Sequence, residues 1–224
     1  MAEIKHKSEP DTIETEFKNE KDLIFFVGGI LKKIQGWCSL DKAQKLVETI
    51  VQTKPELCVE IGVFGGSSYI PQALALKHNK KGVVYGIDPW TCEDALEEMK
   101  DEANIGWWGT LKIEDVYKHC LKNIDYYQVN DYCKILRDKS ENVVDTFEDE
   151  SIDLLHIDGN HSEALSYKDA VMYLPKLKSG GHIFFDDIWW MEENKVTTRK
   201  AIVYLLEHCT REDIVEDCMI LVKN

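Results

Sequence analysis

The feature that most constrains the fold of this chain is an alternation of short β-rich runs with helical stretches. The runs cover residues 57–61, 83–87, 133–136, 152–157 and 182–185, and a short apolar segment follows at 218–222. Apolar residues at helical spacing fill the intervals, at about 67–78, 93–103, 113–124, 141–148, 163–177 and 197–209. Strands that alternate with helices predict a mostly parallel sheet covered on both faces. In such sheets ligands bind at the carboxyl ends of the strands.

Two further helices are expected before the first β-rich run. One covers residues 22–34, and a second begins after Ser39 and ends before Pro55. Residues 1–21 are charged and lack a sustained apolar stripe, which predicts a flexible tail or a segment ordered by a partner. We expect a single domain over residues 22–224, with N-terminal helices at 22–54 and an insertion at about 89–111.

The composition argues against nucleic-acid and membrane partners. Acidic residues outnumber basic ones by 41 to 27, for a net charge of −14, which argues against binding to nucleic-acid backbones. The seven cysteines include no Cys-x-x-Cys pair, so we expect buried, reduced thiols. We find neither the apolar core of a signal peptide nor an apolar run of about 18 residues. A cytoplasmic, soluble protein without a membrane partner is therefore expected.

A glycine-rich segment follows the first β-rich run. It contains the candidate cofactor-binding residues Glu60, Gly62, Gly65, Gly66, Ser67 and Ser68. A strand, a glycine turn and a helix N-terminus together form the usual cradle for a nucleotide-like cofactor. Because Glu60 precedes the first glycine by two residues, the segment suits a ligand with a positive centre better than a pyrophosphate. The alternative is a tight turn that binds nothing.

Two polar residues follow the second and third runs. Asp88 stands where an acid accepts the hydroxyls of a ribose in nucleotide-binding folds, although it could instead cap the next segment. Ser140 lies where a contact with an adenine edge is expected, although a helix cap is equally compatible with its position.

The fourth and fifth runs end in carboxylates. Asp158 follows the fourth run, and Asp186 and Asp187 follow the fifth. If the strands are neighbours, these three carboxylates converge, which is costly without a cation. Oxygen ligands of this kind favour Mg²⁺ or Mn²⁺, although the aspartates could instead cap helices or turns. His161, three residues after Asp158, is the candidate general base, because an imidazole could deprotonate a hydroxyl polarised by the metal.

Together these residues resemble a class I S-adenosylmethionine-dependent methyltransferase over roughly residues 40–224. The 60–68 segment resembles motif I of that superfamily, and Asp88 its acidic ribose residue. The Ile-Asp-Gly-Asn-His and Gly-Gly-His-Ile-Phe-Phe-Asp-Asp segments resemble metal-dependent O-methyltransferases, in particular the macrocin type that methylates sugar hydroxyls. The resemblance implies a Rossmann-like, doubly wound sheet of seven strands. It also implies metal ligation by Asp158, Asp186 and Asp187, and His161 as the general base.

Tryptophans cluster near acids in two segments. The candidate substrate-contacting residues are Trp90, Trp107 and Trp108 in the insertion and Trp189 and Trp190 after the paired aspartates. Tryptophan rings pack against the flat faces of sugars while carboxylates bond to hydroxyls. Alternatively, Trp107 and Trp108 anchor the insertion to the core.

The sequence therefore predicts methyl transfer from S-adenosylmethionine to a hydroxyl of a small molecule or glycan, assisted by a divalent metal. One alternative is a nicotinamide-dependent oxidoreductase, which the missing Gly-x-Gly-x-x-Gly and Tyr-x-x-x-Lys motifs disfavour. Another is a catalytically silent, cofactor-binding partner in a glycan-building assembly. The N-terminal segment could also pair subunits in a homo-oligomer.

Overall fold

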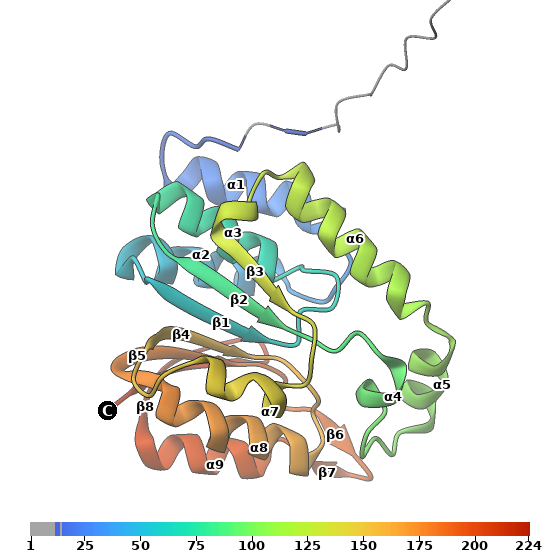
Figure 1. The fold of residues 1–224 in the computed structure, drawn as a ribbon. Coiled ribbons are helices and arrows are strands. Elements are labelled where there is room, and N and C mark those ends of the chain that lie inside the picture. Colours follow the sequence, from blue (N-terminus) through green and yellow to red (C-terminus); the bar gives the residue numbers. More distant parts are fainter. Residues whose placement is uncertain (1–11, 14) are drawn as a thin grey trace, which may run out of the picture.

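The computed structural model describes residues 12, 13 and 15–224. Its main sheet has seven strands in the order β3-β2-β1-β4-β5-β9-β8. The first five pair in parallel, β9 lies antiparallel to β5, and β8 lies antiparallel to β9. Helices cover both faces (Figure 1). The expected α/β class and seven-stranded, mostly parallel sheet are confirmed.

The elements have the following bounds. The strands are β1 Leu57–Ile61, β2 Val83–Ile87, β3 Cys133–Leu136, β4 Ile152–Ile157, β5 Leu177–Phe185, β6 Met191–Glu192, β7 Lys195–Val196, β8 Cys209–Val215 and β9 Cys218–Lys223. The α-helices are α1 Glu20–Leu31, α2 Leu40–Thr53, α3 Tyr69–Asn79, α4 Cys92–Ala95, α5 Glu102–Thr110, α6 Ile113–Tyr126, α7 Ser140–Val143, α8 Glu163–Tyr173 and α9 Arg199–His208. Short 3₁₀ turns lie at Asn130–Tyr132, Val144–Thr146 and Leu174–Lys176. Among the described residues, no helix combines the length and apolarity needed to cross a membrane.

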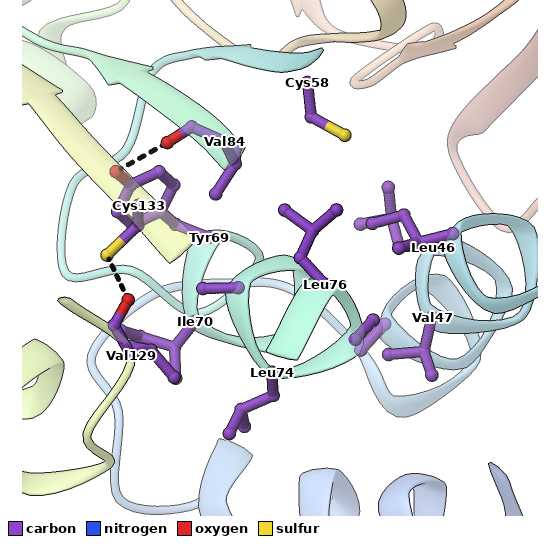
Figure 2. Packing of buried hydrophobic residues seen from close by; sticks show 14 of the residues in the cluster. Leu46, Val47, Cys58, Tyr69, Ile70, Leu74, Leu76, Val84, Val129 and Cys133 are labelled. Atoms are coloured by element: carbon purple, nitrogen blue, oxygen red, sulfur yellow. Dashed lines mark hydrogen bonds between the residues drawn. The ribbon is translucent and has the colours of Figure 1, made fainter. Parts of the chain in front are cut away.

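The sheet separates two hydrophobic cores. Because side chains alternate along a strand, neighbouring residues of β1 belong to different cores: Cys58 packs with α1, α2 and α3, and Val59 packs with α8 and α9. Figure 2 shows Leu46 and Val47 of α2 beside α3 in the first core. In the same view the hydroxyl of Tyr69 donates to the carbonyl of Val84 at 3.2 Å. The β-rich runs are near-continuously apolar because both faces of these strands are covered.

The strand register aligns the ends that carry the candidate site. Ile61 of β1 pairs with Ile87 of β2 and with Ile157 of β4, and Ile157 pairs with Phe185 of β5. The residues that follow these four positions therefore emerge at one edge of the sheet. Figure 1 shows α4 and α5 beside this edge, near the arrowheads of the parallel strands.

Several parts of the chain differ from the sequence-based prediction. Strand β5 begins at Leu177 rather than at residue 182, and the short pair of strands β6 and β7 was not predicted. The expected helix at 93–103 is replaced by the short helix α4, a connecting segment and α5. Strand β8 was not predicted: its first residue was assigned to the last helix, and its centre carries three charged residues, Arg211, Glu212 and Asp213. Strand β8 lies at the edge of the sheet, where polar residues are tolerated, so its sequence lacks the apolar pattern of a β-rich run.

The N-terminal helices pack onto the first core. Ser39 caps α2 by accepting from the backbone N–H of Lys42, so the helix begins directly after Ser39, as expected. In the segment expected to be a tail, two residues contact the end of α6: Ile13 N–H donates to the Tyr126 carbonyl, and the buried Thr15 hydroxyl donates to the Tyr127 carbonyl. Asn19 caps α1, so the last residues of this segment begin that helix. Residues 1–11 and 14 lie outside the described part of the chain.

Candidate functional site

A cavity of about 660 Å³ opens at the carboxyl edge of the sheet. Its wall combines residues that follow β1, β2, β3, β4 and β5, the α4–α5 insertion, and the segment that leads into α2. Of the predicted site residues, the wall includes Gly62, Ser67, Ser68, Asp88, Trp90, Trp107, Trp108, Ser140, Asp158, His161, Asp187 and Trp190. The structure thus brings together residues that are up to 128 positions apart in the chain, from Gly62 to Trp190.

The glycine turn after β1 forms one side of the cavity. Gly62 adopts a φ of +89°, and a Cβ there would lie 1.9 Å from the carbonyl oxygen of Asp158. Only glycine fits, because the loop after β4 crosses directly over this backbone. Gly65 and Gly66 do not line the cavity. Gly65 instead packs against the carbonyl of Gln35, which joins the turn to the N-terminal segment.

We expect Gly62→Ala to destabilise the fold by at least about 2 kcal/mol, from backbone strain and steric overlap. It should also abolish binding of a ligand in the cavity, because the loops after β1 and β4 must separate. Gly106→Ala is the matched control: nothing lies within 4 Å of its Cβ, and alanine in α5 should gain about 0.5–1 kcal/mol. Chemical denaturation of both variants checks this, and equal stabilities would contradict it.

Glu60 lies beneath the turn, fully buried and outside the cavity wall. Its carboxylate accepts from the Ser68 hydroxyl at 2.7 Å and from the Gln72 amide, and it lies 3.4 Å from Nδ1 of His156. Burial alone would lower the pKa of His156, but its contacts with Asp186 and Glu60 raise the pKa to about 10. Glu60 therefore balances a buried imidazolium and holds the helix that follows the turn, rather than facing into the cavity.

Asp88 holds the turn from the end of β2. One carboxylate oxygen accepts the backbone N–H groups of Val63 at 3.1 Å and Phe64 at 2.8 Å, and the other accepts that of Trp90 at 2.7 Å. Burial raises the pKa of Asp88. These contacts shape the turn while the side chain still reaches the cavity wall, so its expected ribose contact stays a prediction.

Ser140 contributes a second polar group to this side of the cavity. It is the first residue of α7, and Lys139 takes the N-cap position, so Ser140 does not cap the helix. Its hydroxyl instead donates to the carboxylate of Asp169, whose pKa burial raises to about 7. Asp169 also lines the cavity and was not identified from the sequence.

The three predicted metal-binding aspartates lie close together but have different partners. Asp158 forms one possible donor set with His156 and Asp186 and another with His161 and Asp187, in each case with ligand atoms within 4.8 Å. No described group of this kind joins Asp158 to both Asp186 and Asp187. Burial raises the pKa of Asp158 well above its ordinary value.

Asp186 is paired with a cation of the protein itself. The Lys42 ammonium lies 2.9 Å and 3.1 Å from its two carboxylate oxygens and 3.0 Å from Oδ1 of Asp217. Burial alone would raise the pKa of Asp186, but the hydrogen bond with His156 and the charges of His156 and Lys42 lower it. Both oxygens of Asp186 are therefore occupied, which leaves Asp158 and Asp187 as the carboxylates that face the cavity.

His161 is joined to one of those two carboxylates. Its Nε2 lies 3.1 Å from Oδ2 of Asp187, and its ring centroid lies 4.8 Å from that of Trp190. The side chain is one-fifth exposed and lines the cavity. A carboxylate at this distance holds an imidazole in one orientation, as a general base requires.

The predicted tryptophans divide into two groups. Trp107, Trp108 and Trp190 line the cavity, whereas Trp189 is 63% exposed and does not. Trp90 reaches the wall but is 1% exposed, and its indole N–H donates to the Phe64 carbonyl at 2.8 Å. Its main contact therefore holds the glycine turn.

Besides Asp169, the cavity wall includes three residues that were not singled out from the sequence: Trp37, Phe64 and Lys42. Trp37 stacks on Phe64 with ring centroids 4.8 Å apart and touches Trp107 at 5.4 Å. The third is Lys42, which precedes the buried Leu46 of α2 by four residues and therefore lies on the same face of the helix. This spacing could have indicated a buried charge. No local pattern could have identified Trp37, because its partners come from distant loops.

The comparisons with known proteins agree with this architecture. The chain is similar to a segment of protein y4gI of Sinorhizobium fredii, 25% identical over 135 residues. These residues are 60% of this chain and 13% of that protein, so the chain spans a small part of the relative's length.

Several solved structures share the fold at low sequence identity. They include the S-adenosylhomocysteine-bound methyltransferase PaMTH1 of Podospora anserina (TM-score 0.63, 14% identity, 91% of this chain and 88% of that one). The O-methyltransferase TomG of Streptomyces achromogenes, in complex with S-adenosylmethionine, has a TM-score of 0.61 at 13% identity (91% and 90%). An O-methyltransferase of Bacillus cereus, in complex with S-adenosylhomocysteine, has a TM-score of 0.60 at 14% identity and is matched over 90% of this chain and 90% of that one. The family model described as "Methyltransferase domain" matches residues 59–188, more than half of the chain. The chain therefore belongs to the methyltransferase-domain family.

Proposed function

We propose that this protein transfers the methyl group of S-adenosylmethionine to a hydroxyl oxygen, with His161 as the general base. The observation that carries the proposal is the His161–Asp187 couple in the wall of the same cavity as the glycine turn. A sulfonium donor already carries an electrophilic methyl group. The protein therefore needs only to align the acceptor and remove its proton.

The cofactor is assigned to the side of the cavity formed by Gly62, Asp88 and Ser140. Three of the similar structures are described with S-adenosylmethionine or S-adenosylhomocysteine, which supports this choice of cofactor. The N-terminus of α3 and the backbone of the turn suit the amino-acid end of such a ligand. Asp158 lines the same cavity as His161, and its carboxyl group would face a positive centre there.

The proton transfer follows from the contact between His161 and Asp187. The neutral imidazole accepts the hydroxyl proton as the oxygen attacks the methyl carbon and the carbon–sulfur bond breaks. The cofactor, when bound, would supply the methyl group and depart as S-adenosylhomocysteine, and the protonated His161 ring would lie 3.1 Å from the Asp187 carboxylate. Solvent then takes up the proton, which restores the base.

The divalent metal expected from the sequence does not fit the three aspartates as they are placed. An ion shared by Asp158, Asp186 and Asp187 needs free oxygens on each, and both oxygens of Asp186 face the Lys42 ammonium. The donor set of His156, Asp158 and Asp186 meets the same obstacle at Asp186. The set of Asp158, His161 and Asp187 would bind the metal through His161, and a ligated ring nitrogen is not available as a base. We therefore propose a metal-independent reaction, with the metal-assisted reaction as the alternative.

Removal of metal ions distinguishes the two reactions. We expect the rate of methyl transfer to be unchanged by EDTA and by added Mg²⁺ or Mn²⁺, because Lys42 already supplies the cation at this edge. The measurement is the initial rate with labelled cofactor after extensive dialysis against chelator. A rate that falls on chelation and returns with Mg²⁺ would establish the metal-assisted reaction.

For the acceptor we propose a sugar or glycan hydroxyl. Trp107, Trp108 and Trp190 form apolar walls of the cavity near the carboxylates of Asp94 and Glu97, a combination that suits the faces and hydroxyls of a sugar ring. Trp37 and Phe64 extend the aromatic surface.

The test is a screen with labelled S-adenosylmethionine against nucleotide sugars, small glycosides and catechol-type phenols, with and without EDTA. Transfer to glycosides supports the sugar assignment, and transfer to phenols alone replaces it while leaving the O-methyl transfer in place. Cofactor binding without transfer to any class would favour the catalytically silent alternative.

A further inference from the structure

We infer that Lys42 is the fixed cation of the candidate site, which positions the base through Asp186 and Asp187 and takes the place of a divalent metal. The inference rests on the proposed function for the role of the base. The exclusion of metal by Lys42 is a property of the unliganded protein and is tested separately.

Lys42 is placed for this role by the N-terminal helix α2. Its side chain is 8% exposed, yet the residue reaches the wall of the cavity. The ammonium contacts both oxygens of Asp186 at the end of β5 and Oδ1 of Asp217 in the turn between β8 and β9. A lysine so deeply buried is rare unless it is paired, and here it joins three segments that are distant in the chain.

The contact continues from Asp186 to the base. Oδ1 of Asp186, 2.9 Å from the ammonium, also accepts the backbone N–H of Asp187 at 3.0 Å. Asp187 adopts a φ of +55°, an unfavourable conformation for a non-glycine residue. The Thr198 hydroxyl fixes it further by donating to its carbonyl at 3.0 Å. In this conformation the Asp187 carboxylate lies 3.1 Å from Nε2 of His161.

The same ammonium prevents Asp186 from binding a metal. It has no lone pair to donate and occupies the space in front of both oxygens of Asp186. It also places a positive charge beside Asp158 and Asp187, which disfavours entry of a second cation. Removing the ammonium would free both oxygens of Asp186 and Oδ1 of Asp217, with the His156 ring, 3.6 Å from Oδ2 of Asp186, as the remaining cation beside them. Hard divalent cations bind such oxygen ligands.

The experiment measures Mn²⁺ binding to the protein alone by electron paramagnetic resonance of the free ion. We expect weak binding to the wild-type protein and binding at least about tenfold tighter to Lys42→Met, because a carboxylate is released and a cation removed. Lys42→Arg is the matched control, since it keeps the charge and should bind Mn²⁺ as weakly as wild type. Lys42→Met/Asp186→Asn should return to weak binding.

The role of Lys42 in positioning His161 is tested by measuring turnover. Lys42→Met should lower kcat while the affinity for S-adenosylhomocysteine is retained, and Lys42→Arg should recover part of kcat. A Lys42→Met protein with wild-type Mn²⁺ affinity would overturn the inference. If Lys42→Met does not fold, Mn²⁺ binding to the wild-type protein is compared with binding to Asp186→Asn. Strong binding to the wild-type protein that is lost in Asp186→Asn would show that Asp186 is a metal ligand, and it would also overturn the inference. Because Mn²⁺ binding needs no methyl acceptor, this measurement tests the exclusion of metal by Lys42 independently of methyl transfer.

Discussion

Replacing His161 with alanine should lower turnover by about 10²- to 10⁴-fold, the usual contribution of a general base. The affinity for S-adenosylhomocysteine should stay at the wild-type value. The side chain lies in the cavity wall beside Asp187 and Trp190. Its truncation leaves the backbone of the glycine turn unchanged, so we expect the base to be lost without disturbing the cofactor. Initial rates with labelled cofactor and calorimetric titration of S-adenosylhomocysteine measure the two effects.

His119→Ala provides the matched control for this experiment. His119 is exposed on α6 and does not line the cavity, so its replacement should change neither turnover nor binding. Turnover of His161→Ala at the rate of His119→Ala would remove His161 from the mechanism. A parallel loss of cofactor affinity would instead assign it to binding.

Replacing Glu60 with alanine should destabilise the protein by about 3–5 kcal/mol, the usual cost of removing one partner of a buried ion pair. For a protein of this size that corresponds to a fall in Tm of roughly 6–20 °C. The Glu60 carboxylate is fully buried, accepts from Ser68 and Gln72, and lies 3.4 Å from the charged ring of His156. Its removal leaves that ring balanced by Asp186 alone, at 3.6 Å.

Glu207→Ala controls for the loss of a glutamate. Glu207 is exposed near the end of α9, so its replacement should shift the free energy of unfolding by less than about 0.5 kcal/mol. Thermal unfolding followed by circular dichroism compares the two variants. Equal Tm values for Glu60→Ala and Glu207→Ala would show that the buried pair does not stabilise the fold.

The strands could be predicted from the sequence because five of them are short apolar runs bounded by turn residues. Their carboxyl ends then located Asp88, Asp158 and Asp187 at one edge, since parallel strands end together. Strand β8 could not be predicted in this way. It is a polar edge strand, and only its pairing with β9 identifies it.

The contacts between individual side chains could not be predicted from the sequence. Lys42 and Asp186 are 144 positions apart, and neither residue type nor spacing indicates that they meet. Likewise Trp189 and Trp190 are neighbours in the chain, yet only Trp190 lines the cavity. These contacts depend on how α2 and the loop after β5 pack in three dimensions, and they decide whether the acidic edge has a lysine or a metal as its cation.

The most direct measurement of the central claim is a calorimetric titration of the wild-type protein with S-adenosylhomocysteine, with NADH as the comparison ligand. The account predicts one bound S-adenosylhomocysteine per chain, lost in Gly62→Ala and retained in His161→Ala, and no binding of NADH. Binding of NADH in the absence of S-adenosylhomocysteine binding would contradict it, because the cavity at the glycine turn would then serve a different chemistry.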